Sequence, residues 1–350
     1  MTSLERDSAR ATPARLADTM IAPAVLHGAK VVVVVPAYRV ASQIQKVIHG
    51  IPGWVHAIVV VEDCSPDETA KQIEACRDPR VVLIRHEVNQ GVGGAMATGF
   101  REALQLQADI VVKMDGDDQM DPAYLPRLVQ PLIDGQADVV KCNRYQHLDA
   151  LRQMPVVRVI GNAGLTFFVK AASGYWNIFD PANGYIAVRA KVLERLDLSQ
   201  LPKRYYFESG FLVELGILRA VVRDLPVPAR YGDEHSSLSP LRVLCEFPPR
   251  LFMGLMRRLF WRYIVHDFSA TSLFLLLGVP MLLFGTSYGA YAYWSHIRDN
   301  AYASAGVVMI AAMPIILGVQ LLLQAVVLDI YNVPREPLCS PLRRAQRDGA

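Results

Sequence analysis

Between residues 30 and 144, short apolar runs alternate with segments of helical pattern. Each run is apolar throughout rather than at every second position, which is typical of strands buried on both faces of a parallel sheet. The predicted strands are Val31–Val35, Ala57–Val61, Val81–Ile84, Ile110–Met114 and Asp138–Val140. This part of the chain is therefore predicted to be an open α/β domain, with ligands at the carboxyl ends of its strands.

Residues 241–266 have a different pattern, in which arginines alternate with aromatic and aliphatic residues. Such spacing is typical of helices that lie on an anionic membrane surface, although an amphipathic helix in a soluble core would share it. Pro248 and Pro249 are expected to divide the segment into two helices, because proline disrupts a helix interior. A further apolar helix is predicted over Val156–Ala172.

Two long stretches without a formal charge follow, Phe268–Ile297 and Asn300–Leu328. Each is longer than the roughly 20 residues that a helix needs to cross a bilayer. Arginines precede the first stretch and follow the second, whereas the turn between them has only Arg298 beside Asp299. The positive-inside rule then places the α/β domain and both termini in the cytoplasm. The alternative is a helical hairpin buried in a soluble core.

Composition narrows the classes of function. A net charge of +3 over 350 residues gives no reason to expect nucleic acid as a partner. The five cysteines are scattered and form no C-x-x-C pair, which argues against a disulfide scaffold or zinc site and favours a reducing compartment. Residues 1–29 lack a continuous apolar segment and are expected to be an N-terminal tail rather than a secretory signal.

An acidic segment directly follows the fourth predicted strand. Side chains alternate along extended chain, so Asp115 and Asp117 are expected to point the same way. Two such carboxylates suit a hard divalent cation that also binds substrate phosphates, and this cation would neutralise a departing nucleoside diphosphate. An EF-hand is excluded, because Met120 and Pro126 stand at its sixth and twelfth positions. The alternative is an acidic turn that caps the next helix, a role expected of Asp121.

The ends of the other predicted strands carry further candidates. Pro36 and Tyr38 follow the first strand and Asp63 the second, where a ring and a carboxylate would meet a nucleotide base or ribose. A packing aromatic and a turn acid are the alternatives. The glycine-rich segment Asn89–Ala95, which includes Gly93, would let a helix N-terminus approach an anion. A dinucleotide fingerprint is disfavoured, because it belongs after the first strand and needs G-x-G-x-x-G.

Five motifs in this order carry a specific resemblance. They are V-P-A-Y (35–38), V-E-D-C-S-P-D-E-T (61–69), N-Q-G-V-G-G-A (89–95), M-D-G-D-D-Q-M-D-P (114–122) and D-P-A-N-G-Y-I-A-V-R (180–189). Over residues 30–240 the chain resembles family-2 glycosyltransferases of the GT-A fold, in particular the dolichol-phosphate mannose synthase and polyprenyl-phosphate glycosyltransferase group. The two apolar stretches resemble the membrane hairpin of bacterial members. The resemblance thus implies an integral protein of a bacterial inner membrane.

The resemblance also implies substrates and site residues. These are a UDP- or GDP-linked sugar donor, a polyprenyl phosphate acceptor, membrane lipids as partners, and Mg²⁺ or Mn²⁺. The implied metal ligands are Asp115, Asp117 and Gln119. The implied catalytic residues are Asp117, Asp180 and Glu208. The implied donor-binding residues are Pro36, Tyr38, Asp63, Gly93, Asp115 and Arg230. Synthases of this group often have a Ser-Lys pair shortly after a basic residue, whereas this chain has Ser236-Ser237 after Arg230. The diphosphate contact and the acceptor are therefore open.

Three functions compete at this point. The expected one is inverting, metal-dependent transfer of a sugar to polyprenyl phosphate. The second is transfer to a hydroxyl of a lipid-linked saccharide or glycolipid, which would need Asp180 or Glu208 as a base. The third is a non-catalytic membrane adaptor. The oligomeric state is open, and a homo-oligomer is compatible with each of the three. The predicted parts are a tail (1–29), the GT-A catalytic domain (30–240), interface helices (241–267), a transmembrane hairpin (268–330) and a C-terminal tail (331–350).

Overall fold

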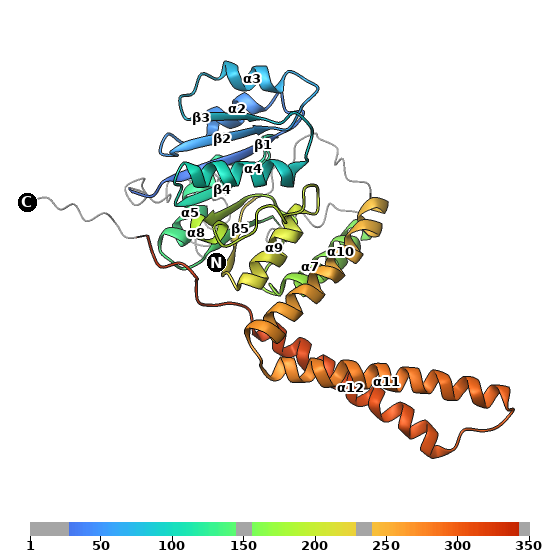
Figure 1. Ribbon diagram of the computed structural model, residues 1–350. Coiled ribbons are helices and arrows are strands. Elements are labelled where there is room, and N and C mark those ends of the chain that lie inside the picture. Colours follow the sequence, from blue (N-terminus) through green and yellow to red (C-terminus); the bar gives the residue numbers. More distant parts are fainter. Residues whose placement is uncertain (1–27, 145–155, 229–239, 343–350) are drawn as a thin grey trace, which may run out of the picture.

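The computed structural model describes residues 28–144, 156–228 and 240–342 (Figure 1). Seven strands in these ranges form one sheet, in the order β3-β2-β1-β4-β6-β5-β7. Within it, β6 runs antiparallel to both of its neighbours and the other pairs are parallel. The strands are β1 Val31–Ala37, β2 Ala57–Glu62, β3 Val81–Arg85, β4 Ile110–Lys113, β5 Val139–Asn143, β6 Ile186–Arg189 and β7 Val222–Pro226. All five predicted strands are present, and the predicted α/β class is confirmed.

Helices cover both faces of this sheet, as Figure 1 shows. Along β1, Val32 and Val34 pack into one apolar core and Val31, Val33 and Val35 into the other, which explains why the strand is apolar at every position. The helices are α2 Ile44–Gly50, α3 Thr69–Ala75, α4 Val92–Gln105, η2 Pro122–Tyr124, α5 Leu125–Ile133, α7 Val156–Ser173, α8 Ala190–Leu193 and α9 Phe207–Leu218.

The predicted division of the basic-aromatic segment at its prolines is wrong. Helix α10 runs without interruption from Pro240 to Phe260 and contains both Pro248 and Pro249, and a π-helical turn, η3 (Trp261–His266), follows it. The two prolines face solvent, whereas the neighbouring Phe247 and Leu251 are buried in the core shared with α7 and α9. This packing on the opposite face holds the helix together across the hydrogen bonds that proline cannot make.

Two long helices, α11 (Ala270–Arg298) and α12 (Ala305–Tyr331), form an antiparallel hairpin that projects from the α/β domain (Figure 1). Glycines let them pack closely, since a Cβ on Gly285 would lie 2.7 Å from Ile315 and one on Gly318 would lie 2.8 Å from the Leu282 nitrogen. Large apolar side chains cover the outside. At 29 and 27 residues both helices are long and apolar enough to cross a membrane.

The chain returns to the sheet after the hairpin. We call residues 333–342 the C-terminal strap. The Leu338 and Cys339 N–H groups donate to the two carboxylate oxygens of Asp138, at 2.9 and 3.0 Å, and Asp138 lies at the start of β5. Arg189 of β6 donates to the Ser340 carbonyl, and Cys339 is buried in the core. As far as residue 342, the segment predicted as a tail is packed on the α/β domain, so both ends of the hairpin are attached to that domain.

A buried ion pair fastens the base of the hairpin. Arg258 of α10 donates from Nη1 and Nη2 to the two carboxylate oxygens of Asp329 in α12, at 2.8 and 2.9 Å. The same carboxylate accepts from the Tyr263 hydroxyl at 2.6 Å and from the Trp176 indole at 3.0 Å. Arg258 also donates from Nε to the Ala172 carbonyl near the end of α7. This Arg258–Asp329 joint therefore links α7, α10, η3 and α12.

Candidate active site

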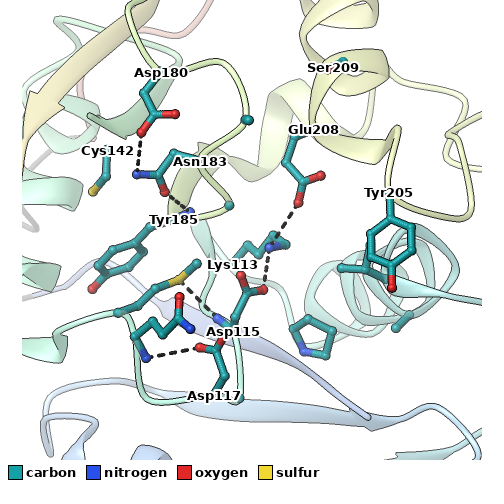
Figure 2. Close-up of a pocket in the computed structure, with 18 of the residues that line it drawn as sticks. Lys113, Asp115, Asp117, Cys142, Asp180, Asn183, Tyr185, Tyr205, Glu208 and Ser209 are labelled. Carbon is teal, nitrogen blue, oxygen red and sulfur yellow. Dashed lines mark hydrogen bonds and ion pairs between the residues drawn. The ribbon is translucent and has the colours of Figure 1, made fainter. Parts of the chain in front are cut away.

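A cavity of about 800 Å³ opens at the carboxyl ends of β1, β2 and β4. Its walls come from the loops after these strands and from α7, α9 and α10. Figure 2 shows part of its lining. Eight of the predicted site residues line it: Pro36, Tyr38, Asp63, Asp115, Asp117, Gln119, Asp180 and Glu208. Gly93 does not reach the cavity, and Arg230 lies outside the described residues.

The acidic loop after β4 presents its two candidate ligands differently. Asp115 faces the ammonium of Lys113, the last residue of β4, with 2.5 Å between Oδ1 and Nζ (Figure 2). Asp117 accepts a hydrogen bond from the Gln119 backbone N–H at 3.1 Å. Between Asp117 and Gln119 the chain turns through a left-handed residue, Asp118 (φ 61°), whose carboxylate pairs with Lys46. Both candidate carboxylates thus lie on the cavity wall, and the tight turn at Asp118 follows them.

This donor set fits a cation that is shared with a substrate. Among the described residues, no group of three or more histidine, cysteine or acidic side chains is arranged to hold a metal ion. Asp115, Asp117 and the Gln119 amide supply only oxygen ligands. Mg²⁺ usually combines one or two carboxylates with phosphate oxygens and water, so two carboxylates on the cavity wall fit a cation whose other ligands come from a substrate.

Sequence reasoning missed Lys113, which joins the two sides of the cavity. The side chain is 2% exposed, and its Nζ lies 3.3 Å from Glu208 Oε1 as well as beside Asp115. Burial alone would lower the pKa of Lys113, but the charges of Asp115 and Glu208 outweigh burial and raise that pKa above its ordinary value. A lysine inside an otherwise apolar strand (Ile110–Lys113) was the available signal.

The predicted catalytic Asp180 is fully engaged by neighbours. Its buried carboxylate accepts from Arg144 Nε at 2.8 Å and Nη2 at 3.2 Å, and from the Arg144 backbone N–H. Next to it, Lys141 of β5 donates to the Asn183 carbonyl. Burial lowers the pKa of Lys141 to about 8. Asp180 therefore orients Arg144, whereas Glu208, in the first turn of α9, faces the cavity with its carboxylate toward Lys113 (Figure 2).

The Asp63 carboxylate is engaged by neighbouring residues of the protein. It is buried, and its carboxylate contacts His86 Nδ1 at 2.7 Å and accepts from the N–H groups of Gln90 and Gly91 at 2.9 and 2.7 Å. These contacts fix the glycine-rich loop beside the cavity. Tyr38, in contrast, is 43% exposed, so one end of the cavity has an open aromatic ring.

The structure explains why Gly93 is a glycine. Its N–H donates to the Lys203 carbonyl at 2.9 Å, and a Cβ at this position would lie 1.8 Å from the Pro202 oxygen. The Gly94 N–H also donates to Lys203. The N–H groups of Gly93 and Gly94 at the start of α4 are thus occupied by the loop before α9, whereas Gly91 and Val92 line the cavity.

Comparison with known proteins now decides the family. Residues 32–197 match the profile described as Glycosyl transferase family 2. A polyprenol monophosphomannose synthase of Mycolicibacterium smegmatis is 30% identical over 184 residues, which are 51% of this chain and 68% of that protein. The chain belongs to glycosyl transferase family 2. The predicted family is confirmed, and the protein is a glycosyltransferase.

Other relatives extend this result. A UDP-N-acetylglucosamine–dolichyl-phosphate N-acetylglucosaminyltransferase of Methanococcus voltae is 28% identical over 229 residues, covering 61% of this chain and 90% of that protein. Glucosyl-3-phosphoglycerate synthase from Mycobacterium tuberculosis, crystallised with Mn²⁺, UDP and glucosyl-3-phosphoglycerate, superposes with a TM-score of 0.50 at 20% identity. This superposition covers 67% of this chain and 81% of that protein. It supports the GT-A fold.

Proposed function

We propose that this glycosyltransferase transfers a sugar from a nucleotide-sugar donor to a polyprenyl phosphate, with inversion, at a membrane surface. The observation that carries the proposal is the position of the cavity. On one side it has the strand-end acids Asp115 and Asp117, and on the other it has α7 and α10, whose far ends meet the hairpin at the Arg258–Asp329 joint. Relatives named for transfer to dolichyl and polyprenol phosphates support the same acceptor class.

The donor would occupy the side built by the loops after β1, β2 and β4. Tyr38 offers a ring to the base, and Asp63 keeps the adjoining loop in place. Asp115, Asp117 and Gln119 would hold Mg²⁺ or Mn²⁺, and the bound cation would supply positive charge to the departing diphosphate. The M. tuberculosis synthase with the same fold was crystallised with Mn²⁺ and UDP, which supports this assignment.

The acceptor side needs no strong base for this reaction. A phosphate monoester is already anionic near neutral pH, so transfer depends on positioning the two substrates and on stabilising the leaving group. Asp180 is held in its pair with Arg144, which agrees with an acceptor that needs no deprotonation. A hydroxyl acceptor would instead depend on Glu208 as base.

We further propose that α11 and α12 cross a bacterial inner membrane, with the catalytic domain in the cytoplasm. The C-terminal strap and α10 both contact the α/β domain, so the two flanks of the hairpin lie on the same side of the bilayer. Those flanks carry the arginines, whereas the turn has Arg298 paired with Asp299. The positive-inside rule favours the cytoplasmic side.

The deciding experiment incubates purified full-length protein with short-chain polyprenyl phosphate, Mg²⁺ or Mn²⁺, and a panel of UDP- and GDP-sugars, followed by mass spectrometry of the lipid. Wild type should add one sugar, and Asp117→Ala should lose transfer by at least about a hundredfold while still inserting into membranes. Transfer to a lipid-linked saccharide but not to polyprenyl phosphate would contradict the acceptor. Turnover by Asp117→Ala with the metal chelated would contradict the role of the cation.

A further inference from the structure

Charged side chains of alternating sign lie along the cavity from the donor side to the acceptor side, and all but the buried Lys141 line it. The contact distances are 2.5 Å between Lys113 and Asp115, 3.3 Å between Lys113 and Glu208, and 2.8 Å between Arg144 and Asp180. Lys141 completes the series through its electrostatic interaction with Asp180 and Glu208. In order, the series is Asp115, Lys113, Glu208, Lys141, Asp180 and Arg144.

Lys113 is the member that connects elements from the two sides. It ends the central strand β4, and its ammonium reaches Asp115 on the next loop and Glu208 in the first turn of α9. The ammonium is packed against the Gly184 backbone, because a Cβ on Gly184 would lie only 2.4 Å from Nζ and 2.9 Å from Asp115 Oδ2. Lys113 therefore places a positive charge directly against one of the two implied metal ligands.

This arrangement creates a competition. The short contact engages Asp115 Oδ1, so a cation that binds this oxygen must approach the buried ammonium, a charge of its own sign. Glu208 is the second carboxylate within reach of the ammonium, at a longer distance that leaves the contact room to shorten. Lys113 thus has an alternative partner when a cation takes Asp115.

We propose that Lys113 is a positioning residue that holds the Asp115 carboxylate in the donor-free enzyme and yields it to the cation when the donor enters. Its ammonium then pairs with Glu208. Because Glu208 belongs to the first turn of α9 and that turn lines the cavity, arrival of the cation tightens the acceptor-side wall. This inference rests on the proposed function, through cation binding at Asp115 and Asp117.

The competition predicts effects of opposite sign. Lys113→Met removes the repelling charge, so donor-free protein should bind Mn²⁺ about tenfold more tightly. Glu208→Gln removes the alternative partner of the ammonium, so Mn²⁺ binding should weaken by about threefold. If Lys113 only stabilised the fold, both substitutions would loosen the site and weaken binding, because each leaves a buried charge without its partner.

The experiment titrates Mn²⁺ into full-length protein in detergent micelles without donor, and electron paramagnetic resonance measures the free ion. Lys141→Met is the matched control. Lys141 and Lys113 are both buried, and each pairs with Ile186 of β6 in the sheet. Lys141 does not contact Asp115, so the Mn²⁺ affinity of Lys141→Met should stay within about twofold of wild type. The double variant Lys113→Met/Glu208→Gln loses one charge of each sign. This double variant replaces Lys113→Met in the titration if Lys113→Met does not fold, and it should also bind Mn²⁺ more tightly than wild type.

Two results would overturn the inference in distinguishable ways. If Asp115→Asn abolishes Mn²⁺ binding but Lys113→Met and the double variant bind no more tightly than wild type, the role of Lys113 is refuted and the cation site stands. If Asp115→Asn and Asp117→Asn both bind Mn²⁺ like wild type, the cation site itself is refuted. Tighter binding in Lys113→Met together with weaker binding in Glu208→Gln would support the exchange.

Discussion

The Arg258–Asp329 joint should be among the most costly contacts in the molecule to break. Asp329 is 4% exposed in the intact protein, and Arg258→Met removes two charge-assisted hydrogen bonds from its carboxylate. Tyr263 and Trp176 remain as its donors, and neither carries a charge. The carbonyls at the end of α7 lose their donor as well. Removing one partner of a buried ion pair costs roughly 3–5 kcal/mol, so we expect the free energy of unfolding to fall by about 4 kcal/mol.

The neighbouring arginine on the same helix provides a matched control. Arg257 pairs with Glu214, but these side chains are 41% and 19% exposed. An ion pair in contact with water contributes up to about 1 kcal/mol, so Arg257→Met should change stability by less than that. A second comparison is Arg258→Met combined with Asp329→Leu. It removes both charges together, and it should recover most of the stability lost in the single variant.

Titration with a denaturing detergent in mixed micelles measures these differences. Tryptophan fluorescence is a suitable signal, because Trp176 donates directly to Asp329 and should respond when the joint opens. Equal stability of Arg258→Met and Arg257→Met would contradict a costly buried pair. If Arg258→Met/Asp329→Leu is as unstable as Arg258→Met, the loss comes from packing rather than from an uncompensated carboxylate.

Two further predictions concern the loop before α9 and the buried lysine of β5. Gly93→Ala should destabilise the protein by roughly 1–3 kcal/mol and raise the donor KM, because its Cβ would overlap the Pro202 oxygen. Gly53→Ala is the control, since a Cβ there meets nothing within 4 Å. Equal stability of the two variants in thermal unfolding would contradict the predicted overlap. Burial lowers the pKa of Lys141 to about 8 from 10.5, so the unfolded chain binds more protons between these pH values. Wild-type stability should therefore rise with pH over that window relative to Lys141→Met, and parallel pH profiles would refute the assignment.

The sequence was most informative where burial is uniform. The central strands are apolar at every position because both faces are covered, and the acids after β4 follow from the rule that ligands meet at strand ends. Strand β6 was not predicted, because its insertion between β4 and β5 depends on contacts distant in sequence. Proline propensity misled at α10, where burial of Phe247 and Leu251 outweighs the local cost.

The same limit applies to individual site residues. The resemblance implied that Asp63, Asp115 and Glu208 are site residues, and all three line one cavity. It gave no sign that Asp180 would be held by Arg144 or that Gly93 would be covered by the 202–204 loop, because both partners come from elsewhere in the chain. Lys113 was visible as a charge in an apolar strand, but its purpose depends on carboxylates that only the fold brings together.

The C-terminal strap has a consequence for how the protein is made. Asp138 is synthesised some 200 residues before Leu338 and Cys339, whose N–H groups its carboxylate accepts. While the ribosome is still translating the hairpin, this part of the sheet has a buried acid without two of its donors. The sheet can therefore complete the hydrogen bonds of Asp138 only after both apolar helices have been synthesised and the chain has returned to the α/β domain.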